Sequence, residues 1–474
     1  MSQLSLVARA AYILRDNSTG VITKAAPALY PHQWSWDAAF NAIGLAAVDP
    51  PRARLELDSL LRGQWRNGMV PHIVFDPAAD GYFPGPERWE CARYSADAPS
   101  DVETSGICQP PVHAIAAARI LAAAPGQDAW AARVYPRLLA WHRYLARYRI
   151  DPGTGLITLF HGWESGMDNS PRWDAPYGNV RPGPGLPPYT RRDSAHVADA
   201  AERPTDAEYD RYLWLIEEAK RAGYDPVRLR QAGSFQVGDV LFTAVFAAAC
   251  DALAGLAASY TASYTASYTA EDTAELRGYA AAARAAVLAH RGPDGLAVDV
   301  DLRTRERLAS QTVAGFAPLI AGGLTAADRG KLVEALFGPC WAGHPELRWP
   351  LPPSTSPCST AFRRSGYWRG PVWPVMTWLL AWALRRDGES AAAGRLRTAT
   401  LAQLAGGEFA EYYDALNGAP LGSHHQSWTA AVTLDWLLAD PTPPRLGLRA
   451  RPVASARRSG PRDCHNHGHL NPWL

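Results

Sequence analysis

Signals for metal, membrane and disulfide chemistry are scarce in this sequence. Its six cysteines are scattered over 474 residues with no CxxC spacing, which argues against both a zinc site and a disulfide framework. We therefore expect reduced, structural thiols, no metal and no cofactor. The sequence has no uninterrupted apolar run near 18 residues and no signal-peptide pattern at its N-terminus. These absences predict a cytoplasmic protein with no membrane partner.

An excess of charge of one sign is also absent. The sequence has 47 Lys and Arg against 46 Asp and Glu, a formal net charge of +1 at pH 7. Without a global positive field, and with no basic face before roughly the last thirty residues, nucleic acid and anionic membranes are poor partners. A small, weakly charged ligand fits better. The composition leaves the oligomeric state open, homo-oligomers included.

Tryptophan, by contrast, is abundant. The chain has 18 tryptophans, and many stand beside Pro, Gly and acidic residues rather than within apolar helical runs. Flat rings with a polar edge suit the C–H faces of a sugar, and the neighbouring carboxylates and amides suit its hydroxyls. The alternative, a tryptophan-rich core, explains part of them.

Helical patterns recur almost from end to end, whereas alternating strand patterns are scarce. With 47% hydrophobic residues the chain can bury a large core. Helices are expected at roughly 4–15, 36–48, 51–66, 110–123, 127–147, 206–222, 236–257, 271–290, 310–321, 325–337, 371–386, 388–405 and 426–439. Thr205 and Glu208 form a capping-box pattern at the start of one of them. About a dozen helices without a fixed repeat indicate an all-α fold of six helical hairpins, an (α/α)6 barrel.

One catalytic domain is expected over residues 1–445. Long loops rich in Pro, Gly and Trp would gather at one mouth of the barrel, where function usually resides. Among them, segments near 67–109 and 176–204 are predicted to be cap or lid insertions.

Two segments are expected to lie outside this fold. The SYTA repeats at 258–270 indicate a lengthened loop, and the basic residues 446–474 indicate a disordered tail. The tail contains Cys464, His465, His467 and His469, which we interpret as accidental neighbours rather than as a metal site.

Four stretches share an unusual mixture of tryptophan, acids, amides, Gly and Pro. They are YPHQWSWD (30–37), TSGICQPP (104–111), HGWESGMDNSPRWD (161–174), and SGYWRGPVW (365–373) together with EFAEYYDALNGAPLGSHHQSW (408–428). Carboxylates and amides are costly to bury, and Pro and Gly break regular structure, so a core has little use for this mixture. Each stretch lies at or next to an expected helix end. This distribution is expected if successive barrel loops line one cavity.

Paired carboxylates are the simplest catalytic apparatus that these stretches offer, because the sequence has no phosphate loop and no HExxH motif. Cleavage of a glycoside needs such a pair: one acid protonates the departing oxygen, and the other activates water or attacks carbon. The candidates are Asp37, Glu164, Asp168, Asp174, Glu408, Glu411 and Asp414. Composition alone does not choose among them.

The strings WSWDAAF, SGICQPP, GWESGMDNSPRWD, YWRGPVWP and EYYD…HHQSW resemble glycoside hydrolase family 63, in particular its bacterial mannosylglycerate and glucosylglycerate hydrolases. The likeness runs in order over roughly residues 28–440. It implies an (α/α)6 barrel that hydrolyses α-glycosides with inversion of configuration. It places the general acid at Asp168 and the general base at Glu411. An acid in a tryptophan-lined, partly desolvated setting would stay protonated near neutral pH.

The resemblance also implies a set of substrate-binding residues. For the sugar these are Tyr30, Trp34, Ser35, Trp36, Asp37, Tyr82, Gln109, Trp163, the backbone at Gly166, Tyr367 and Trp368, with Trp373 and Gln426 lining the same pocket. Arg203 and Tyr209 fall where these hydrolases hold the glycerate part. Core packing is the alternative for each tryptophan, a helix N-cap for Asp37, and a surface ion pair with Glu202 or Asp206 for Arg203.

The function expected from this likeness is hydrolysis of 2-O-α-glucosylglycerate, 2-O-α-mannosylglycerate or both to hexose and D-glycerate. Activity on another small α-glucoside is the nearest alternative. A sugar epimerase or isomerase would depend on histidines, and His32, His161, His424 and His425 keep it open. A third alternative for the function is a non-catalytic sugar-binding module. The sequence does not rank glucose against mannose.

Overall fold

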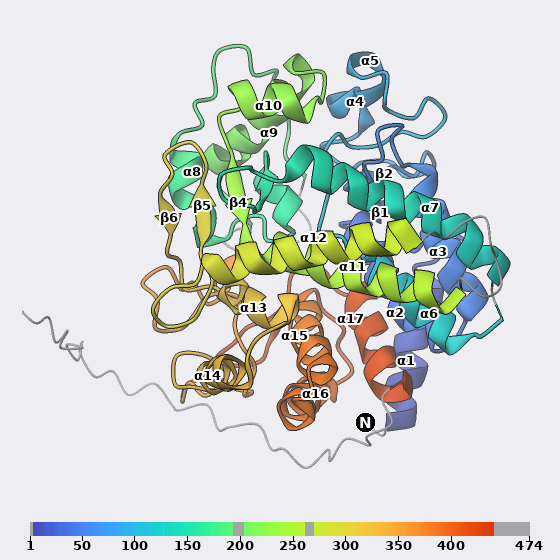
Figure 1. Ribbon diagram of the computed structural model, residues 1–474, viewed down its shortest axis with the longest axis vertical. Helices are drawn as coiled ribbons and strands as arrows, with labels where there is room; N and C mark the ends of the chain where they lie inside the picture. Colours follow the sequence, from blue (N-terminus) through green and yellow to red (C-terminus); the bar gives the residue numbers. More distant parts are fainter. Residues whose placement is uncertain (1–2, 127, 193–202, 261–269, 440–474) are drawn as a thin grey trace, which may run out of the picture.

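The computed structural model describes residues 3–126, 128–192, 203–260 and 270–439, and its secondary structure is mainly helical (Figure 1). The α-helices are α1 (Gln3–Asp16), α2 (Ser35–Ala46), α3 (Pro50–Arg62), α4 (Pro86–Trp89), α5 (Cys91–Tyr94), α6 (His113–Ala123), α7 (Asp128–Tyr144), α8 (Asp174–Gly178), α9 (Asp206–Arg221), α10 (Pro226–Ala232), α11 (Val240–Tyr260), α12 (Ala270–Ala289), α13 (Ala317–Ala321), α14 (Ala326–Leu336), α15 (Pro374–Arg386), α16 (Ser390–Leu404) and α17 (Ser427–Leu434). Short 3₁₀ turns at Gly162–Ser165, Pro171–Trp173, Val313–Phe316 and Tyr367–Arg369, and π-helical turns at Leu145–Arg149 and Asp435–Ala439, complete the helical part.

Helices that follow one another in the chain pack as pairs. The pairs α2 with α3, α11 with α12, and α15 with α16 are in close contact, and α17 packs against both α1 and α2. The last helix therefore meets the first. This arrangement is consistent with the expected ring of helical hairpins, and Figure 1 shows α11 and α12 side by side across its middle.

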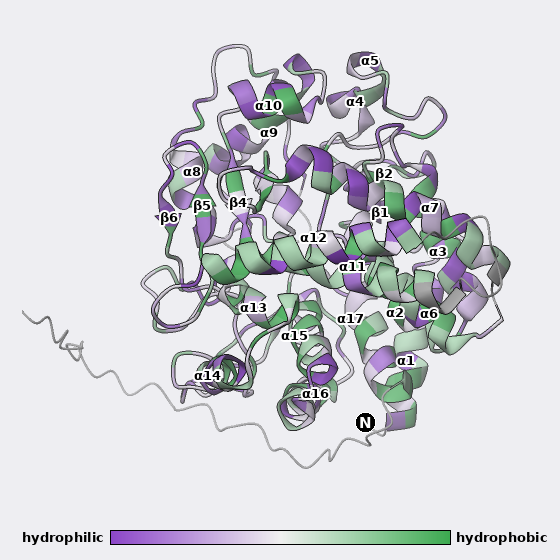
Figure 2. Ribbon diagram, viewed as in Figure 1, coloured by the Kyte–Doolittle hydropathy of each residue, from purple (hydrophilic) through white to green (hydrophobic). Residues whose placement is uncertain are grey.

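Helix α11 carries the most apolar sequence of the fold. Its segment Val240–Ala257 is long and apolar enough to cross a membrane, but 78% of it is buried inside the protein. It packs against α6, α12 and α13, so burial in the core accounts for its composition. Hydrophilic residues are frequent on outlying helices such as α9, α10 and α14 (Figure 2).

The strands are short. They are β1 (Gln33–Trp34), β2 (Ile73–Val74), β3 (Ile157–Leu159), β4 (Val237–Asp239), β5 (Asp299–Asp301), β6 (Arg307–Leu308), β7 (Tyr412–Tyr413) and β8 (Pro420–Leu421). The order β3-β4-β5-β6 forms one antiparallel sheet, with Thr158 opposite Gly238, and β1 with β2 and β7 with β8 form two-stranded pairs. Strands of two or three residues show no alternation, so the sequence did not reveal this sheet.

The capping box predicted at Thr205 is confirmed. The Thr205 hydroxyl accepts the N–H of Glu208 at 3.3 Å, and the Thr205 N–H donates to the Glu208 carboxylate at 2.7 Å. The expected helix at 310–321 differs, because a 3₁₀ turn precedes the short α13. The loop expected at 258–270 lies mostly outside the described residues, as does the tail at 446–474 with its cysteine and histidines.

The expectation of reduced cysteines is wrong for one pair. Cys340 and Cys358 form a disulfide with their Cα atoms 5.4 Å apart. The loop that follows α14 folds back on itself, and an 18-residue separation is not a motif that a sequence reveals. Cys91, Cys108 and Cys250 are free and buried, as structural thiols are expected to be.

Candidate active site

A cavity of about 490 Å³ collects residues from all of the unusual stretches. Fourteen of the seventeen predicted site residues line it: Tyr30, Trp34, Trp36, Asp37, Tyr82, Gln109, Trp163, Gly166, Asp168, Arg203, Tyr209, Tyr367, Glu411 and Gln426. The stretches lie far apart in the chain and meet here because each follows or precedes a helix. The predicted gathering of loops around one cavity is what the structure shows.

Ser35, Trp368 and Trp373 lie behind the cavity wall instead. The Ser35 hydroxyl is 3.0 Å from His113 Nε2. The rings of Trp368 and Trp373 stack with their centroids 3.6 Å apart, and Tyr367 packs on Trp373 at 5.3 Å. These two tryptophans therefore support a residue that lines the cavity, as the core-packing alternative describes.

The structure separates the seven candidate carboxylates. Asp37, Asp168 and Glu411 line the cavity. The other four have partners elsewhere: Glu164 pairs with Arg149 at 2.6 Å, Asp174 pairs with Arg369 at 2.6 Å, Glu408 lies 2.8 Å from the imidazole of His424, and Asp414 pairs with Arg364. Because these four do not line the cavity, they are not placed to exchange a proton with a ligand bound there.

Asp168 sits in a tight loop that follows strand β3 and the 3₁₀ turn Gly162–Ser165. Gly166 has a φ of +70°, and a Cβ there would lie 2.5 Å from the ring of Trp36, so only glycine fits. The Met167 carbonyl accepts the indole N–H of Trp173 at 2.9 Å, which fixes the loop. Burial, and then the negative charge of Glu411, raises the pKa of Asp168 from 3.8 to about 7. A carboxyl in this state can donate a proton near neutral pH.

Glu411 is held in place by three hydrogen-bond donors. Its Oε1 accepts from the hydroxyl of Tyr30 at 2.9 Å, and its Oε2 accepts from the Ser423 N–H at 3.0 Å and lies 3.4 Å from Arg203 Nη2. Contacts to both of its oxygens fix the orientation of this carboxylate. Such a carboxylate can accept a proton from water.

Two tyrosines connect the two acids. The Tyr367 hydroxyl is 3.5 Å from Asp168 Oδ2 and 3.4 Å from the Tyr30 hydroxyl, which in turn donates to Glu411. The carboxylate oxygens at the two ends of this chain are therefore at most about 10 Å apart, a limit that includes both the roughly 6.5–9.5 Å separation of inverting glycosidases and the roughly 5–5.5 Å of retaining ones.

The third carboxylate, Asp37, lies in the first turn of α2 rather than at its N-cap, which is Trp34. Burial, and then the negative charge of Glu411, raises its pKa well above the ordinary value. Gln109 accepts the N–H of Trp36 at 3.2 Å, and the rings of Trp34 and Tyr82 meet edge to face at 5.2 Å. Polar groups and aromatic faces thus share one wall of the cavity.

Arg203 is buried, and it points at the site rather than at the surface. Its Nη1 donates to the Tyr30 hydroxyl at 2.8 Å, and its guanidinium lies 4.9 Å from the ring centre of Tyr367. Asp206, the surface partner considered for it, pairs with Arg191 at 2.8 Å. Glu202 lies outside the described residues.

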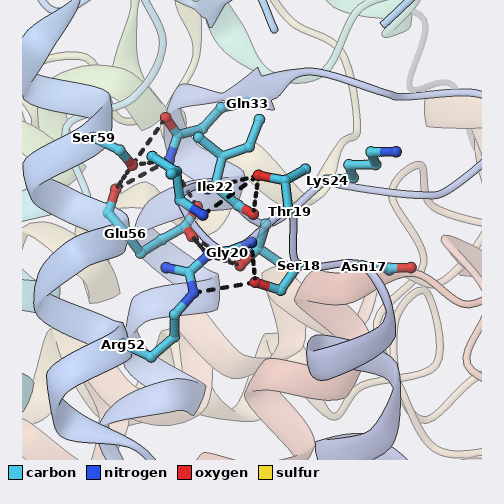
Figure 3. Close-up of polar contacts among 12 residues, drawn as sticks. Asn17, Ser18, Thr19, Gly20, Ile22, Lys24, Gln33, Arg52, Glu56 and Ser59 are labelled. Atoms are coloured by element: carbon cyan, nitrogen blue, oxygen red, sulfur yellow. Dashed lines mark hydrogen bonds and ion pairs between the residues drawn. The ribbon is translucent and has the colours of Figure 1, made fainter. Parts of the chain in front are cut away.

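The strand that carries Trp34 is held by a buried polar network (Figure 3). Glu56 of α3 is fully buried and accepts from Thr23, Gln33 and Arg52 at 2.8 Å each. Burial raises the pKa of Glu56, against the opposing charge of Arg52. Because Gln33 pairs with Val74 beside Trp34, the network fixes the register of β1 at the cavity.

Comparison with known proteins identifies the family of this chain. Residues 30–429 match the model of the mannosylglycerate hydrolase MGH1-like glycoside hydrolase domain. The chain belongs to this glycoside hydrolase family. It is 51% identical over 441 residues to the glucosylglycerate hydrolase of Mycolicibacterium hassiacum, covering 91% of this chain and 97% of that protein.

Solved structures of this family have the same fold. The GH63 mannosylglycerate hydrolase of Thermus thermophilus in complex with Tris and D-glycerate superposes with a TM-score of 0.81 at 39% identity, over 91% of this chain and 99% of that one. Its complex with glucose gives a TM-score of 0.79 at 38% identity with the same coverage.

Sequence reasoning missed several cavity residues of this glycoside hydrolase, chiefly His72, Arg191, Arg192, Tyr212 and Trp428. Tyr212 lies about one helical turn after Tyr209 on the buried side of α9, and that spacing was a usable signal. The two arginines belong to the TRRD string of the predicted lid. Trp428 ends the predicted stretch 408–428, whose composition was the signal, whereas His72 carried no signal that distinguishes a cavity wall from a core.

The histidines of the epimerase alternative do not line the cavity. Burial lowers the pKa of His32 to about 4 and that of His161 to about 4. His161 bonds the Trp163 N–H and the Tyr212 carbonyl, and His424 pairs with Glu408 outside the cavity. Among the described residues, no group of three or more His, Cys, Asp or Glu side chains is placed to hold a metal ion.

Proposed function

We propose that this glycoside hydrolase cleaves 2-O-α-glycosides of D-glycerate with inversion, and that glucosylglycerate is its preferred substrate. The observation that carries the proposal is the pair Asp168 and Glu411, which line one cavity and are joined through Tyr367 and Tyr30. The 51% identity to a glucosylglycerate hydrolase, against 39% to a mannosylglycerate hydrolase, supports glucose as the hexose.

In the proposed reaction, Asp168 gives its proton to the glycosidic oxygen as the bond from that oxygen to the anomeric carbon breaks. Glu411 takes a proton from a water molecule, whose oxygen attacks the anomeric carbon from the opposite face. Glycerate leaves with its hydroxyl restored, and the sugar leaves as the β-anomer. The raised pKa of Asp168 and the donors around Glu411 match these two roles.

The cavity offers the two ends of this substrate different surroundings. Trp34, Trp36 and Tyr82 provide faces for the hexose. Arg191, Arg192 and Arg203 come from one segment of the chain and form a cationic part of the cavity lining. A guanidinium is well suited to a carboxylate, so we assign the glycerate carboxylate to this cationic part, with Arg203 as its principal partner.

We also propose that the segments near 67–109 and 176–204 cap this site. Residues 80–84 and 191–192 both line the cavity. They are joined by the bond from Arg192 to the Gly81 carbonyl at 3.1 Å. The Phe83 carbonyl also accepts from the hydroxyl of Tyr209 in α9 at 3.3 Å. Location in the cytoplasm and the oligomeric state stay predictions.

Steady-state assays on glucosylglycerate, mannosylglycerate and a neutral α-glucoside such as trehalose test this function. Glucosylglycerate should give the highest kcat/KM. Asp168→Asn and Glu411→Gln should each lower kcat by at least about 10³-fold without unfolding the protein. Asp174→Asn, which alters an acid of the same stretch outside the cavity, should keep nearly full activity. A higher kcat/KM on the neutral glucoside would favour the alternative α-glucosidase.

A further inference from the structure

Tyr367 holds a backbone conformation that tyrosine rarely adopts. Its φ of +59° lies in the left-handed region, which favours glycine and asparagine. Residues are kept there only when the surrounding structure holds them, and they concentrate at functional sites. The hydroxyl of Tyr367 is the one that lies between Tyr30 and Asp168. The unusual turn therefore determines where a group next to the proposed acid is placed.

The side chain of Asn169 bonds to both sides of this turn. Its Oδ1 accepts the N–H of Trp368 at 2.9 Å, and its Nδ2 donates to the carbonyl of Gly366 at 3.2 Å. These two groups belong to the peptide units that flank Tyr367. A side-chain amide provides the acceptor and the donor that this pair requires. The two hydrogen bonds are lost if Tyr367 rotates to a negative φ.

Asn169 is not placed to touch a substrate. It is only 7% exposed, it does not line the cavity, and both ends of its amide bond to the backbone. Its neighbour in the sequence is Asp168. The residue thus connects the loop of the proposed acid to a turn almost 200 positions away in the chain.

We propose that Asn169 is a positioning residue whose amide holds the left-handed turn at Tyr367, and thereby presents the tyrosine hydroxyl to Asp168 and to Tyr30, the partner of Glu411. The hydroxyl then donates to Asp168 when that acid has given up its proton. The turn has a further restraint, since the Tyr367 carbonyl accepts the indole N–H of Trp373 at 3.3 Å. This bond keeps the segment attached to the domain when the Asn169 amide is lost, so Asn169→Ala should displace the turn rather than unfold the domain.

A structure of the Asn169→Ala variant tests the placement without any substrate. The expected result is a negative φ at Tyr367 and a hydroxyl displaced from Asp168. An unchanged left-handed turn would overturn the inference. Asn17→Ala is the matched control, because the buried Asn17 amide donates to the His425 carbonyl and to the Ser427 hydroxyl at 2.8 Å each, away from this turn. That variant should leave φ at Tyr367 unchanged.

A double-mutant cycle tests the consequence for catalysis. Asn169→Ala and Tyr367→Phe should each lower kcat/KM by about 10- to 100-fold, the effect of losing a hydrogen bond to a charged group. If Asn169 acts through the hydroxyl, the kcat/KM of the double variant should be within about threefold of that of the less active single variant. If the fold-losses of the two single variants multiply in the double variant, the inference is contradicted. In the control pair, Asn17→Ala and Tyr367→Phe, the two fold-losses should multiply, because the residues act independently.

The pH profile distinguishes positioning from general damage. The Tyr367 hydroxyl bonds the ionised form of Asp168 and lowers its pKa, so its displacement should move the alkaline limb of kcat/KM to higher pH in both single variants. A merely structural loss would lower the rate and leave the limb in place.

If Asn169→Ala does not fold, Asn169→Asp replaces it in the cycle. Asn169→Asp keeps the acceptor for the Trp368 N–H and loses the donor to the Gly366 carbonyl. Its added charge is present both with and without the Tyr367 hydroxyl, so the effect of the charge cancels in the cycle. The kinetic arms rest on the proposed function, so wild-type protein is assayed first. Absence of turnover on every α-glycoside would refute that function, and the structural arm would still decide the role of Asn169.

Discussion

Replacing Asp168 by Asn should abolish turnover and at the same time stabilise the protein at alkaline pH. Burial, and then the charge of Glu411, raises the pKa of this carboxyl from 3.8 to about 7. In the unfolded chain the group titrates near its ordinary value, so between pH 3.8 and 7 the folded state holds a proton that the unfolded state has lost. The contribution of this carboxyl to the free energy of unfolding is therefore fully present below pH 3.8 and is lost as the pH rises to about 7.

The difference in pKa corresponds to about 4 kcal/mol of unfolding free energy, an upper figure because Asp168 keeps contact with the cavity. Asparagine has the same shape and no charge, so it avoids this cost. The stability gain of Asp168→Asn should thus be small near pH 4 and should grow by up to about 4 kcal/mol at pH 8.

Urea unfolding followed by tryptophan fluorescence at several pH values between about 4 and 8 measures this gain. Asp174→Asn is the control, since it removes an exposed carboxylate that pairs with Arg369 at 2.6 Å and should bring no gain at alkaline pH. Parallel stability curves for wild type and Asp168→Asn across this range would refute the reasoning, because they would mean that folding does not shift the proton affinity of Asp168.

Three other predictions follow from single contacts. Arg203→Gln should lower kcat/KM for glucosylglycerate about 10- to 100-fold more than for trehalose, because a charge-assisted bond to the glycerate carboxylate is lost; equal losses in a parallel assay would remove Arg203 from that role. Gly166→Ala should destabilise the fold by about 1–3 kcal/mol in urea, because its Cβ would lie 2.5 Å from the ring of Trp36; an unchanged urea midpoint would contradict this packing. Glu164→Gln should cost about 3–5 kcal/mol, because it leaves Arg149 buried without its partner at 2.6 Å; a cost below about 1 kcal/mol would mean that the pair is not buried as described.

The helices were predictable because their apolar residues recur at helical spacing over ten or more positions. Helix α9 illustrates this, with its capping box at Thr205 and its buried Tyr209 face. Strands β3 to β6 have no such signal, since each spans two or three residues and is defined by pairing across the chain. The disulfide between Cys340 and Cys358 depends in the same way on how a long loop folds back.

The candidate site was predictable as a set of stretches, and the choice of acids came from the family resemblance. Composition does not distinguish Glu164 from Asp168, which stand four positions apart in one stretch. The structure distinguishes them by a partner, because Arg149 neutralises Glu164 while Asp168 faces the cavity. Likewise the stretch around Tyr367 identified three aromatic residues, but only the fold shows that Trp368 and Trp373 lie behind it.

The anomeric form of the sugar at the moment of its release tests most directly whether Asp168 and Glu411 flank one linkage with a water molecule between them. Proton NMR of glucosylglycerate hydrolysis, recorded faster than mutarotation, should show β-glucose appearing first. Initial release of α-glucose would contradict the account, because it would require a covalent intermediate on a carboxylate rather than direct attack by water.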